Sequence, residues 1–403
     1  MKNAFLGRPP NAPNHVIQET VSFSVCSGYI WREQKRFALH AFRNLGFGKH
    51  KMEDHIKEEL SFFLKTLEDH GDEAFNVRPY LSASTSNNIS ALMFGRRMHY
   101  DDPKRVLLNK VVDDLLRFFR PTGYHAFFPR LRSLLFRYEL LGYKDVNFTI
   151  KEMLKFIDEE IKYHRKTLDA DNVRDYVDSY LLEMEKKKES KNTSFSIPML
   201  RGNISSLFGA GGSTIRTTLE WSLLTMAGYP DIQKKIHAEI DEVVGKEKTP
   251  SWMDHSSMPY TEAVLMEVQR WKTVVPVNLV RYGLRDETVQ GYYIPKGTIV
   301  FANLWEVHHD SRYWDNPDKF IAERFLSEDG RTVIKHPCYM PFTIGKRSCP
   351  GESLAVMEVF LYFTTILQKF DILPPKGEVI NFDAALGIIY EPLPYKLRFI
   401  LRN

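Results

Sequence analysis

The chain has 403 residues, of which 43% are hydrophobic and 26% charged, and these proportions exclude a disordered or collagen-like protein. The 55 basic residues barely outnumber the 51 acidic ones, so the sequence lacks the basic excess typical of a nucleic-acid-binding protein. With no run of about 18 apolar residues and only three cysteines, the chain predicts neither a transmembrane helix nor a disulfide framework.

Hydrophobic periodicity predicts helices in four stretches of the chain. They are 50–69, 104–119, 147–165 and 197–228. Ser196 is a suitable N-cap for the last of them, and Gly228 before Tyr229 is a suitable end. Strands are expected at 279–283, 288–294, 298–301 and 396–401. The expected fold is therefore mainly α with a minor β part.

The stretch 121–136 mixes aromatic, aliphatic and arginine side chains between two expected helices. Such a run is more often buried core, and this is the interpretation we favour. The alternative is a loop that dips into a membrane surface, with arginines that reach back to the lipid headgroups.

The stretch 341–351, PFTIGKRSCPG, is the most informative part of the chain. Gly345 and Gly351 allow the backbone to turn tightly around Cys349. Loop amides and the helix expected after them would stabilise a thiolate, and such a thiolate can ligate haem iron. Arg347 can pair with a carboxylate such as a haem propionate.

A lone cysteine in a loop of this kind is more often a buried structural residue. The pattern Phe-x-x-Gly-x-Arg-x-Cys-x-Gly, from Phe342 to Gly351, is expected by chance in only about one in ten thousand chains of this length. It resembles the haem-binding loop of the cytochrome P450 haem-thiolate monooxygenases. The resemblance extends over the chain from about Phe5 and is closest to microsomal animal members that metabolise drugs, steroids and fatty acids.

The resemblance implies a cytochrome P450 fold in a single haem-binding catalytic domain over residues 1–403. It also implies that this fold is incomplete at the N-terminus, without the family's membrane anchor and part of its small β-sheet. The implied cofactor is one haem b, with Cys349 as the axial thiolate ligand of the iron. Further haem contacts are implied for Arg347, Phe342, Gly351, Trp31, Lys35, Arg281, Ala210 and Gly211.

Two of these implied haem contacts, Lys35 and Arg281, are less well supported by the family pattern than the others. Lys35 stands where arginine is usual in the family's Trp-x-x-x-Arg helix, so it keeps the charge and loses the bidentate fork. Arg281 aligns with a basic position that binds a propionate, although an ordinary exposed arginine explains it equally well.

Glu267 and Arg270 lie three residues apart on an expected helix, and such a pair is usually solvated surface. In the family, the corresponding residues form a buried charge triad with a later arginine, here Arg324, and the triad holds the haem loop in place. The implied role is structural. Ala322 stands where proline is usual in the segment of Arg324, and this departure puts little in doubt.

Residues 209–214, GAGGST, place three glycines inside the helix expected at 197–228. Because these glycines cost about 2–3 kcal/mol relative to alanine, they need a reason. One interpretation ends a helix here and begins another with Ser213 or Thr214 as its N-cap. A second interpretation is a phosphate-binding loop, but the lysine of the pattern GxxxxGK(S/T) is missing here. The resemblance implies instead that small residues leave room for haem and O2, and that Thr214 hydrogen-bonds the oxygen.

Ser213 is the main departure from the family, which has Asp or Glu at this position. A serine cannot act as a general acid at neutral pH, although it can orient a water. Ser213 and Thr214 are therefore the candidate catalytic residues, and oxygen activation in this chain would be slower or differently routed.

The implied activity inserts one atom of O2 into a lipophilic xenobiotic, steroid or fatty acid. Electrons would come from NADPH through a flavoprotein reductase, with cytochrome b5 as a further partner, and no nucleic acid is implied. The implied location is the cytosolic face of the endoplasmic reticulum membrane, with peripheral membrane contact. One set of basic residues is either solvated surface or a docking patch for an acidic electron donor. These residues are Arg32, Lys35, Arg36, Arg43, Lys49 and Lys51.

Two other functions stay open on the sequence alone. A haem-thiolate isomerase or dehydratase acting on peroxides needs neither O2 nor a reductase and fits the missing acid at Ser213. A truncated chain that binds haem without turnover is the second. The expected substrate pocket is apolar, with the candidate residues Phe118, Phe119, Val274, Val275 and Ile388.

Overall fold

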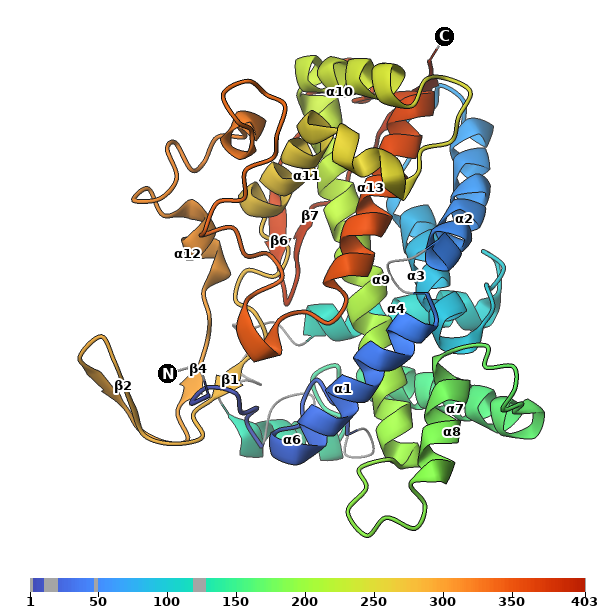
Figure 1. Ribbon diagram of the computed structural model, residues 1–403, viewed down its shortest axis with the longest axis vertical. Helices are drawn as coiled ribbons and strands as arrows, with labels where there is room; N and C mark the ends of the chain where they lie inside the picture. The colour runs from blue at the N-terminus through green and yellow to red at the C-terminus, as the bar shows by residue number, and fades with distance from the viewer. Residues whose placement is uncertain (1–2, 11–20, 47–49, 119–127, 403) are drawn as a thin grey trace.

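Helix α9 (Ile197–Gly228) runs through the middle of the protein, and the other helices pack around it (Figure 1). The structure is a computed structural model, and it describes residues 3–10, 21–46, 50–118 and 128–402. Ser196 caps α9, since its hydroxyl accepts a hydrogen bond from the N–H of Met199 at 3.3 Å. Both ends of this helix lie where the sequence predicts them.

The mainly α character expected from the sequence is confirmed. The other α-helices are α1 (Gly28–Asn44), α2 (His50–Asp69), α3 (Arg78–Phe94), α4 (Pro103–Phe118), α6 (Pro129–Arg137), α7 (Tyr143–Thr167), α8 (Tyr176–Lys186), α10 (Pro230–Val243), α11 (Pro259–Trp271), α12 (Leu304–His309) and α13 (Glu352–Lys369). Short 3₁₀ helices lie at η2 (Trp252–Ser257), η3 (Ala322–Phe325) and η4 (Gly345–Arg347). Helices α2, α4 and α7 correspond to the three shorter helices that periodicity predicts.

The described strands form short antiparallel pairs. The pairs are β1 (Arg281–Tyr282) with β4 (Ile299–Val300), β2 (Glu287–Val289) with β3 (Tyr292–Ile294), β5 (Phe370–Leu373) with β8 (Arg398–Leu401), and β6 (Ala384–Leu386) with β7 (Tyr390–Pro392). The single strand expected at 288–294 is wrong. Gln290 and Gly291 have φ angles of 49° and 87°, and this left-handed pair turns the chain into the β2–β3 hairpin.

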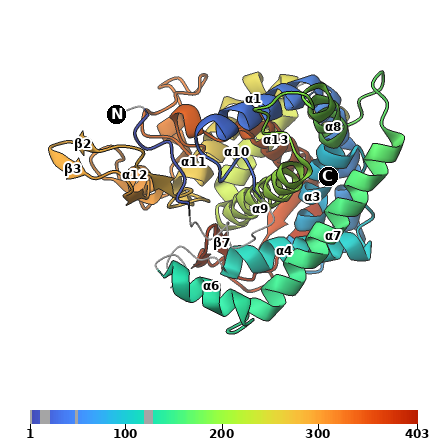
Figure 2. The same cartoon turned by 90° about the horizontal axis from the view of Figure 1, so that it is seen from below.

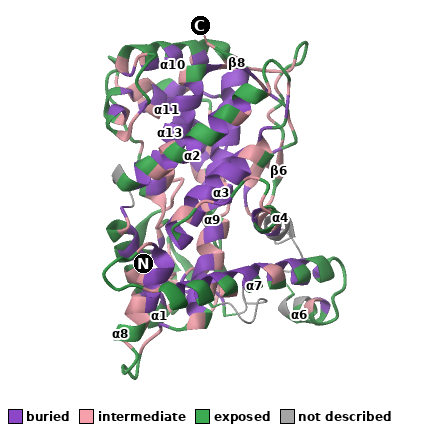
Figure 3. Cartoon of the chain, turned by 90° about the vertical axis from the view of Figure 1, so that its right-hand side faces the viewer, coloured by how far each residue is buried: buried purple, intermediate pink, exposed green. Residues whose placement is uncertain are grey.

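Helix α3 packs along α9, and both are largely buried (Figure 3). Gly211 on α9 permits the close approach, because a Cβ there would lie 2.4 Å from Cδ1 of Ile89 on α3. Inside α9, the Ser213 hydroxyl donates to the carbonyl of Gly209 at 2.7 Å, as helical serines commonly do. The glycines therefore lie within one continuous helix, and the interpretation that ends a helix there is wrong.

Helices α6 and α7 form one outer edge of the protein (Figure 2). Phe128, Leu131 and Leu134, at the start of α6 and along it, are exposed, whereas Leu135 is buried. The expectation of buried core over 121–136 is therefore wrong for most of its described part, and 121–127 lie outside the described residues. None of the described helices combines the length and the apolar character that a membrane span requires.

Candidate functional site

A cavity of about 470 Å³ lies between α9, α1, the start of α13 and the loop before α13. Its lining is mostly apolar and includes Val274, Val275 and Ile388, as expected. The side chain of Phe118 and all of Phe119 lie outside the described part of the chain. None of the described residues that line this cavity is Asp or Glu.

The loop at 341–351 presents the sulfur of Cys349 to this cavity. The loop closes through a hydrogen bond from the N–H of Cys349 to the carbonyl of Phe342 at 3.0 Å. Gly345 has a φ of 81°, so its glycine is needed for the turn. Gly351 has a φ of −97°, which any residue adopts, so the turn itself does not require glycine at this position.

The environment of Cys349 is suited to holding a metal-bound thiolate. Burial raises the pKa of the thiol, and the charge of Glu352 raises it further, while the N–H of Gly351 and the ammonium of Lys35 favour the charged form. Helix α13 begins at Glu352, so its positive end lies beside the sulfur. Cys26 and Cys338 do not line the cavity.

Arg347 and Lys35 both line the cavity, and backbone carbonyls fix both side chains. Arg347 donates to the carbonyl of Leu6 at 2.8 and 3.0 Å, and its guanidinium lies 3.9 Å from the ring centre of Trp31. Lys35 donates to the carbonyls of the cysteine loop at positions 346 and 348, at 2.8 and 3.1 Å. Lysine at this position therefore ties α1 to the loop.

Arg8 also lines the cavity, and sequence reasoning missed it. Its guanidinium donates to the carbonyls of Leu279 and Val280 at 2.9 and 2.6 Å. Burial, together with the charges of Arg281 and Arg347, lowers the pKa of Arg8 to about 9. The Arg8 guanidinium also donates to the carbonyl of Ser24 at 2.9 Å. Its only sequence signal is an arginine between glycine and proline, because backbone carbonyls of other segments leave no pattern of residue types.

Four cations thus gather at one side of the cavity, namely Arg8, Lys35, Arg281 and Arg347. Arg281 does not itself line the cavity, but its charge lowers the pKa of Arg8, Lys35 and Arg347. With no carboxylate among the described lining residues, these cations repel one another until an anionic group arrives. A haem with its two propionates fits this arrangement, because its iron can bind Cys349 while its carboxylates lie beside the cations.

Helix α9 supplies the wall that carries the candidate catalytic residues. Ala210, Gly211, Ser213 and Thr214 all line the cavity. The Thr214 hydroxyl donates to the carbonyl of Ala210 at 2.8 Å. Because the hydroxyl protons of Ser213 and Thr214 are used within the helix, both oxygens are left to accept hydrogen bonds.

The structure brings Glu267, Arg270 and Arg324 together away from the cavity. Glu267 and Arg270 are fully buried and form two hydrogen bonds, at 2.7 and 2.8 Å. Arg324 donates to the same carboxylate at 3.3 Å, and the N–H of Ile321 does so at 2.9 Å. The cluster therefore joins α11 to the chain around η3.

The basic residues of the expected docking patch divide into two groups. Arg32, Arg36, Arg43 and Lys51 are exposed, whereas Lys35 is turned toward the cysteine loop. Lys49 lies outside the described residues. The exposed residues therefore form a basic surface along α1 and the start of α2.

Comparison with known proteins agrees with this geometry. A family model described as Cytochrome P450 matches residues 2–399. Cytochrome P450 2U1 of Bos taurus is 37% identical over 371 residues, which are 92% of this chain and 68% of that protein. Cytochrome P450 2J2 of Homo sapiens is 36% identical over 400 residues, 98% of this chain and 78% of that protein. Cytochrome P450 2J3 of Rattus norvegicus is 36% identical over 405 residues, 100% of this chain and 79% of that protein.

Proposed function

The chain belongs to the cytochrome P450 family, and from this premise we propose that Cys349 is the thiolate ligand of its haem iron. As a member of this family it is a haem-thiolate monooxygenase that acts on lipophilic substrates with O2 and electrons from NADPH. The observation that carries the assignment is that Cys349 faces the cavity and neither other cysteine lines it. The alternatives of a peroxide isomerase and of a protein without turnover are not favoured.

Haem, when bound, supplies the chemistry that activates O2, so that one oxygen atom enters the substrate and the other leaves as water. The chain supplies the setting. The N–H of Gly351 and the start of α13 stabilise the charge on Cys349. Arg8 and Arg347 offset the charge of the propionates, and the apolar lining excludes water and receives a lipophilic substrate.

Thr214 is proposed to position the oxygen that reacts. Its hydroxyl oxygen faces the cavity with lone pairs available, and small residues on the same helix leave space beside it. Thr214→Ala is expected to divert electrons from product to hydrogen peroxide while substrate binding is largely kept. An unchanged ratio of product to NADPH would make the threonine a packing residue.

We also propose which electron donors bind this protein and at which membrane it lies, beyond what membership of the family shows. A flavoprotein reductase, and cytochrome b5, would dock on the basic surface of Arg32, Arg36, Arg43 and Lys51, because acidic donors are attracted to such a surface. The exposed apolar residues Phe128, Leu131 and Leu134 support a peripheral contact with a membrane, which we propose to be the cytosolic face of the endoplasmic reticulum.

The test is the dependence of product formation on the reductase. Haem-loaded protein with reductase, NADPH and a panel of fatty acids, steroids and drugs should form oxygenated product. Product from a lipid hydroperoxide in the absence of NADPH, with none from the complete system, would support the isomerase instead. Haem binding without product under either condition would support the protein without turnover.

A further inference from the structure

A small second compartment of about 20 Å³ lies beside the main cavity, between α3, α4 and α9. About 10–15 Å³ of such space is enough for one water molecule, provided that polar partners are near. Most of the lining residues are polar or charged, and these are Ser82, Ser86, Asn109, Asp113, Ser213 and Arg216. The compartment is therefore large enough and polar enough to hold one water molecule.

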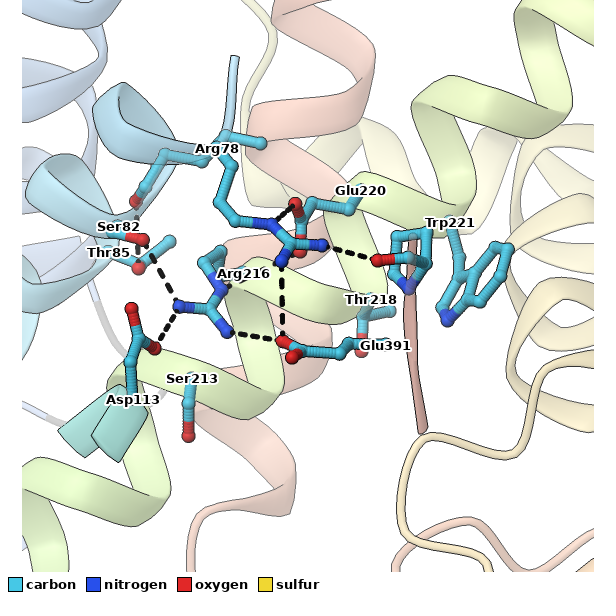
Figure 4. Close-up of polar contacts among 12 residues, drawn as sticks. Arg78, Ser82, Thr85, Asp113, Ser213, Arg216, Thr218, Glu220, Trp221 and Glu391 are labelled. Carbon is cyan, nitrogen blue, oxygen red and sulfur yellow. Dashed lines mark hydrogen bonds and ion pairs between the residues drawn. The ribbon is translucent and has the colours of Figure 1, made fainter. Parts of the chain in front are cut away.

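Asp113 on α4 links this compartment to solvent. Its side chain is 29% exposed, whereas that of Arg216 on α9 is 3% exposed. Arg216 donates to Oδ1 of Asp113 at 2.6 Å and to the hydroxyl of Ser82 at 3.2 Å (Figure 4). On its other side Arg216 donates to Glu391 at 3.2 Å, so its position is fixed from both directions. The carboxylate of Asp113 is thus held at the compartment with one side toward solvent.

Ser213 links the same compartment to the main cavity. Among the described residues only Ser213 and Val112 line both spaces, and only Ser213 has a polar side chain. Its hydroxyl oxygen accepts hydrogen bonds, because its proton is donated to the carbonyl of Gly209. Ser213 and Arg216 lie on the same stretch of α9, and Asp113 on α4 lines the compartment together with them (Figure 4).

We propose that Asp113, one water and Ser213 form the path by which protons enter the main cavity, in place of an acid on α9. This inference rests on the proposed function, because a monooxygenase consumes protons when one oxygen atom leaves as water. One proton passes from solvent to Asp113, a proton passes from Asp113 to the water, and another passes from the water to Ser213. As the oxygen of Ser213 accepts this proton, its own hydroxyl proton leaves the carbonyl of Gly209 and passes into the cavity, so each group regains its starting charge.

The test compares variants of the haem-loaded protein with reductase in excess. Asp113→Asn keeps the shape and the hydrogen bond to Arg216 but loses the ability to carry a proton, and Ser213→Ala removes the hydroxyl. Asp158→Asn is the matched control, because Asp158 on α7 pairs with Arg201 on α9 at 2.8 and 2.9 Å, and neither residue lines the compartment.

We expect Asp113→Asn and Ser213→Ala each to lower the product formed per NADPH by about tenfold. This is less than the loss of about 100-fold or more that follows removal of a general acid, because other waters can deliver part of the protons. The double variant should equal the lower single variant, because the two residues act in series. Asp158→Asn should match the wild type. An Asp113→Asn variant that couples as well as Asp158→Asn, or losses that multiply in the double variant, would overturn the path.

A second readout does not depend on turnover. A high-resolution crystal structure of the haem-loaded wild type should contain a water within hydrogen-bond distance of Asp113 and Ser213, and Ser213→Ala should lose or displace it. A wild-type compartment without water would overturn the path. A wild type that forms no product with reductase would overturn the proposed function alone, since the crystal structure still decides whether the water is present.

Discussion

Two buried clusters of arginine and carboxylate side chains differ in how completely their polar atoms are bonded. The α11 cluster consists of Glu267, Arg270 and Arg324. The α9 cluster consists of Arg78, Asp113, Arg216, Glu220 and Glu391 (Figure 4). The first joins α11 to a loop, and the second joins α9 to α3, α4 and β7.

The α11 cluster satisfies its central arginine. All five N–H groups of Arg270 have acceptors, two on Glu267 and three on the carbonyls of His308, Pro317 and Lys319. In the α9 cluster, Nε of Arg216 and Oε2 of Glu220 lie 3.6 Å apart without a hydrogen bond. A saturated cluster is a rigid joint, whereas an incompletely bonded one beside a water-sized compartment can exchange hydrogen bonds with water.

The comparison predicts the largest effect for removal of Glu267. Glu267→Ala leaves two buried arginines without their carboxylate and should lower the free energy of unfolding by about 3–5 kcal/mol. Little soluble, haem-loaded protein should result, as measured by urea unfolding and haem content. Glu323→Ala is the control, because Glu323 pairs with Lys235 at the surface and should cost at most about 1 kcal/mol. A Glu267→Ala variant as stable as this control would make the α11 cluster energetically unimportant.

A smaller loss is expected for Arg216→Ala in the α9 cluster. Glu220 keeps its 2.5 Å contact with Arg78, and Asp113 is partly solvated, so we expect a loss of about 1–3 kcal/mol in urea unfolding. Arg201→Ala on the same helix, with a partner that is 45% exposed, is the matched control and should lose less. If Arg216→Ala lost as much stability as Glu267→Ala, the distinction between the clusters would be wrong.

The smallest expected change in stability concerns a buried ion pair between His164 and Asp175, which is lost when the histidine is deprotonated at higher pH. His164 donates from Nδ1 to the carbonyl of Glu160 at 2.7 Å and from Nε2 to Asp175 at 2.9 Å, and only an imidazolium donates from both nitrogens. Burial opposes the charge, but Asp175 dominates with its hydrogen bond and charge, so the pKa of His164 is raised above 6.5. Its stabilising contribution is complete below that ordinary value and is lost as pH rises through the folded pKa.

Urea unfolding of the wild type and of His164→Gln, followed from pH 6.5 upward, measures this contribution. Stability should fall with rising pH in the wild type, and this component should be missing in the variant. Equal slopes in the two proteins would show that His164 is not an imidazolium in the folded state.

The sequence predicts the parts of this protein whose signals are local. Periodicity and a capping serine locate α9, and one loop pattern locates Cys349. Helix α3 gives no such signal, because it is buried on all sides and its core-facing serines and asparagines resemble an exposed segment. Packing against α9 determines the position of α3, and the hydrophobic periodicity of its own sequence does not predict it.

The charged residues divide in the same way. The α11 cluster is predictable only through the family resemblance, because the spacing of Glu267 and Arg270 by itself is more typical of solvated surface. Arg8 is not predictable, because its guanidinium contacts backbone carbonyls of Ser24, Leu279 and Val280, two of which lie more than 270 residues away along the chain. Asp113 and Arg216 likewise meet only when α4 folds over α9, so neither residue type nor spacing marks them beforehand.

The most direct test of the central claim is the optical spectrum of the reduced protein with CO bound, recorded for three cysteine variants. Cys26→Ala and Cys338→Ala should keep the red-shifted Soret band that a thiolate ligand produces, because neither sulfur lines the cavity. Cys349→Ala should abolish that band. Retention of the red-shifted band in Cys349→Ala would contradict the assignment of Cys349 as the iron ligand.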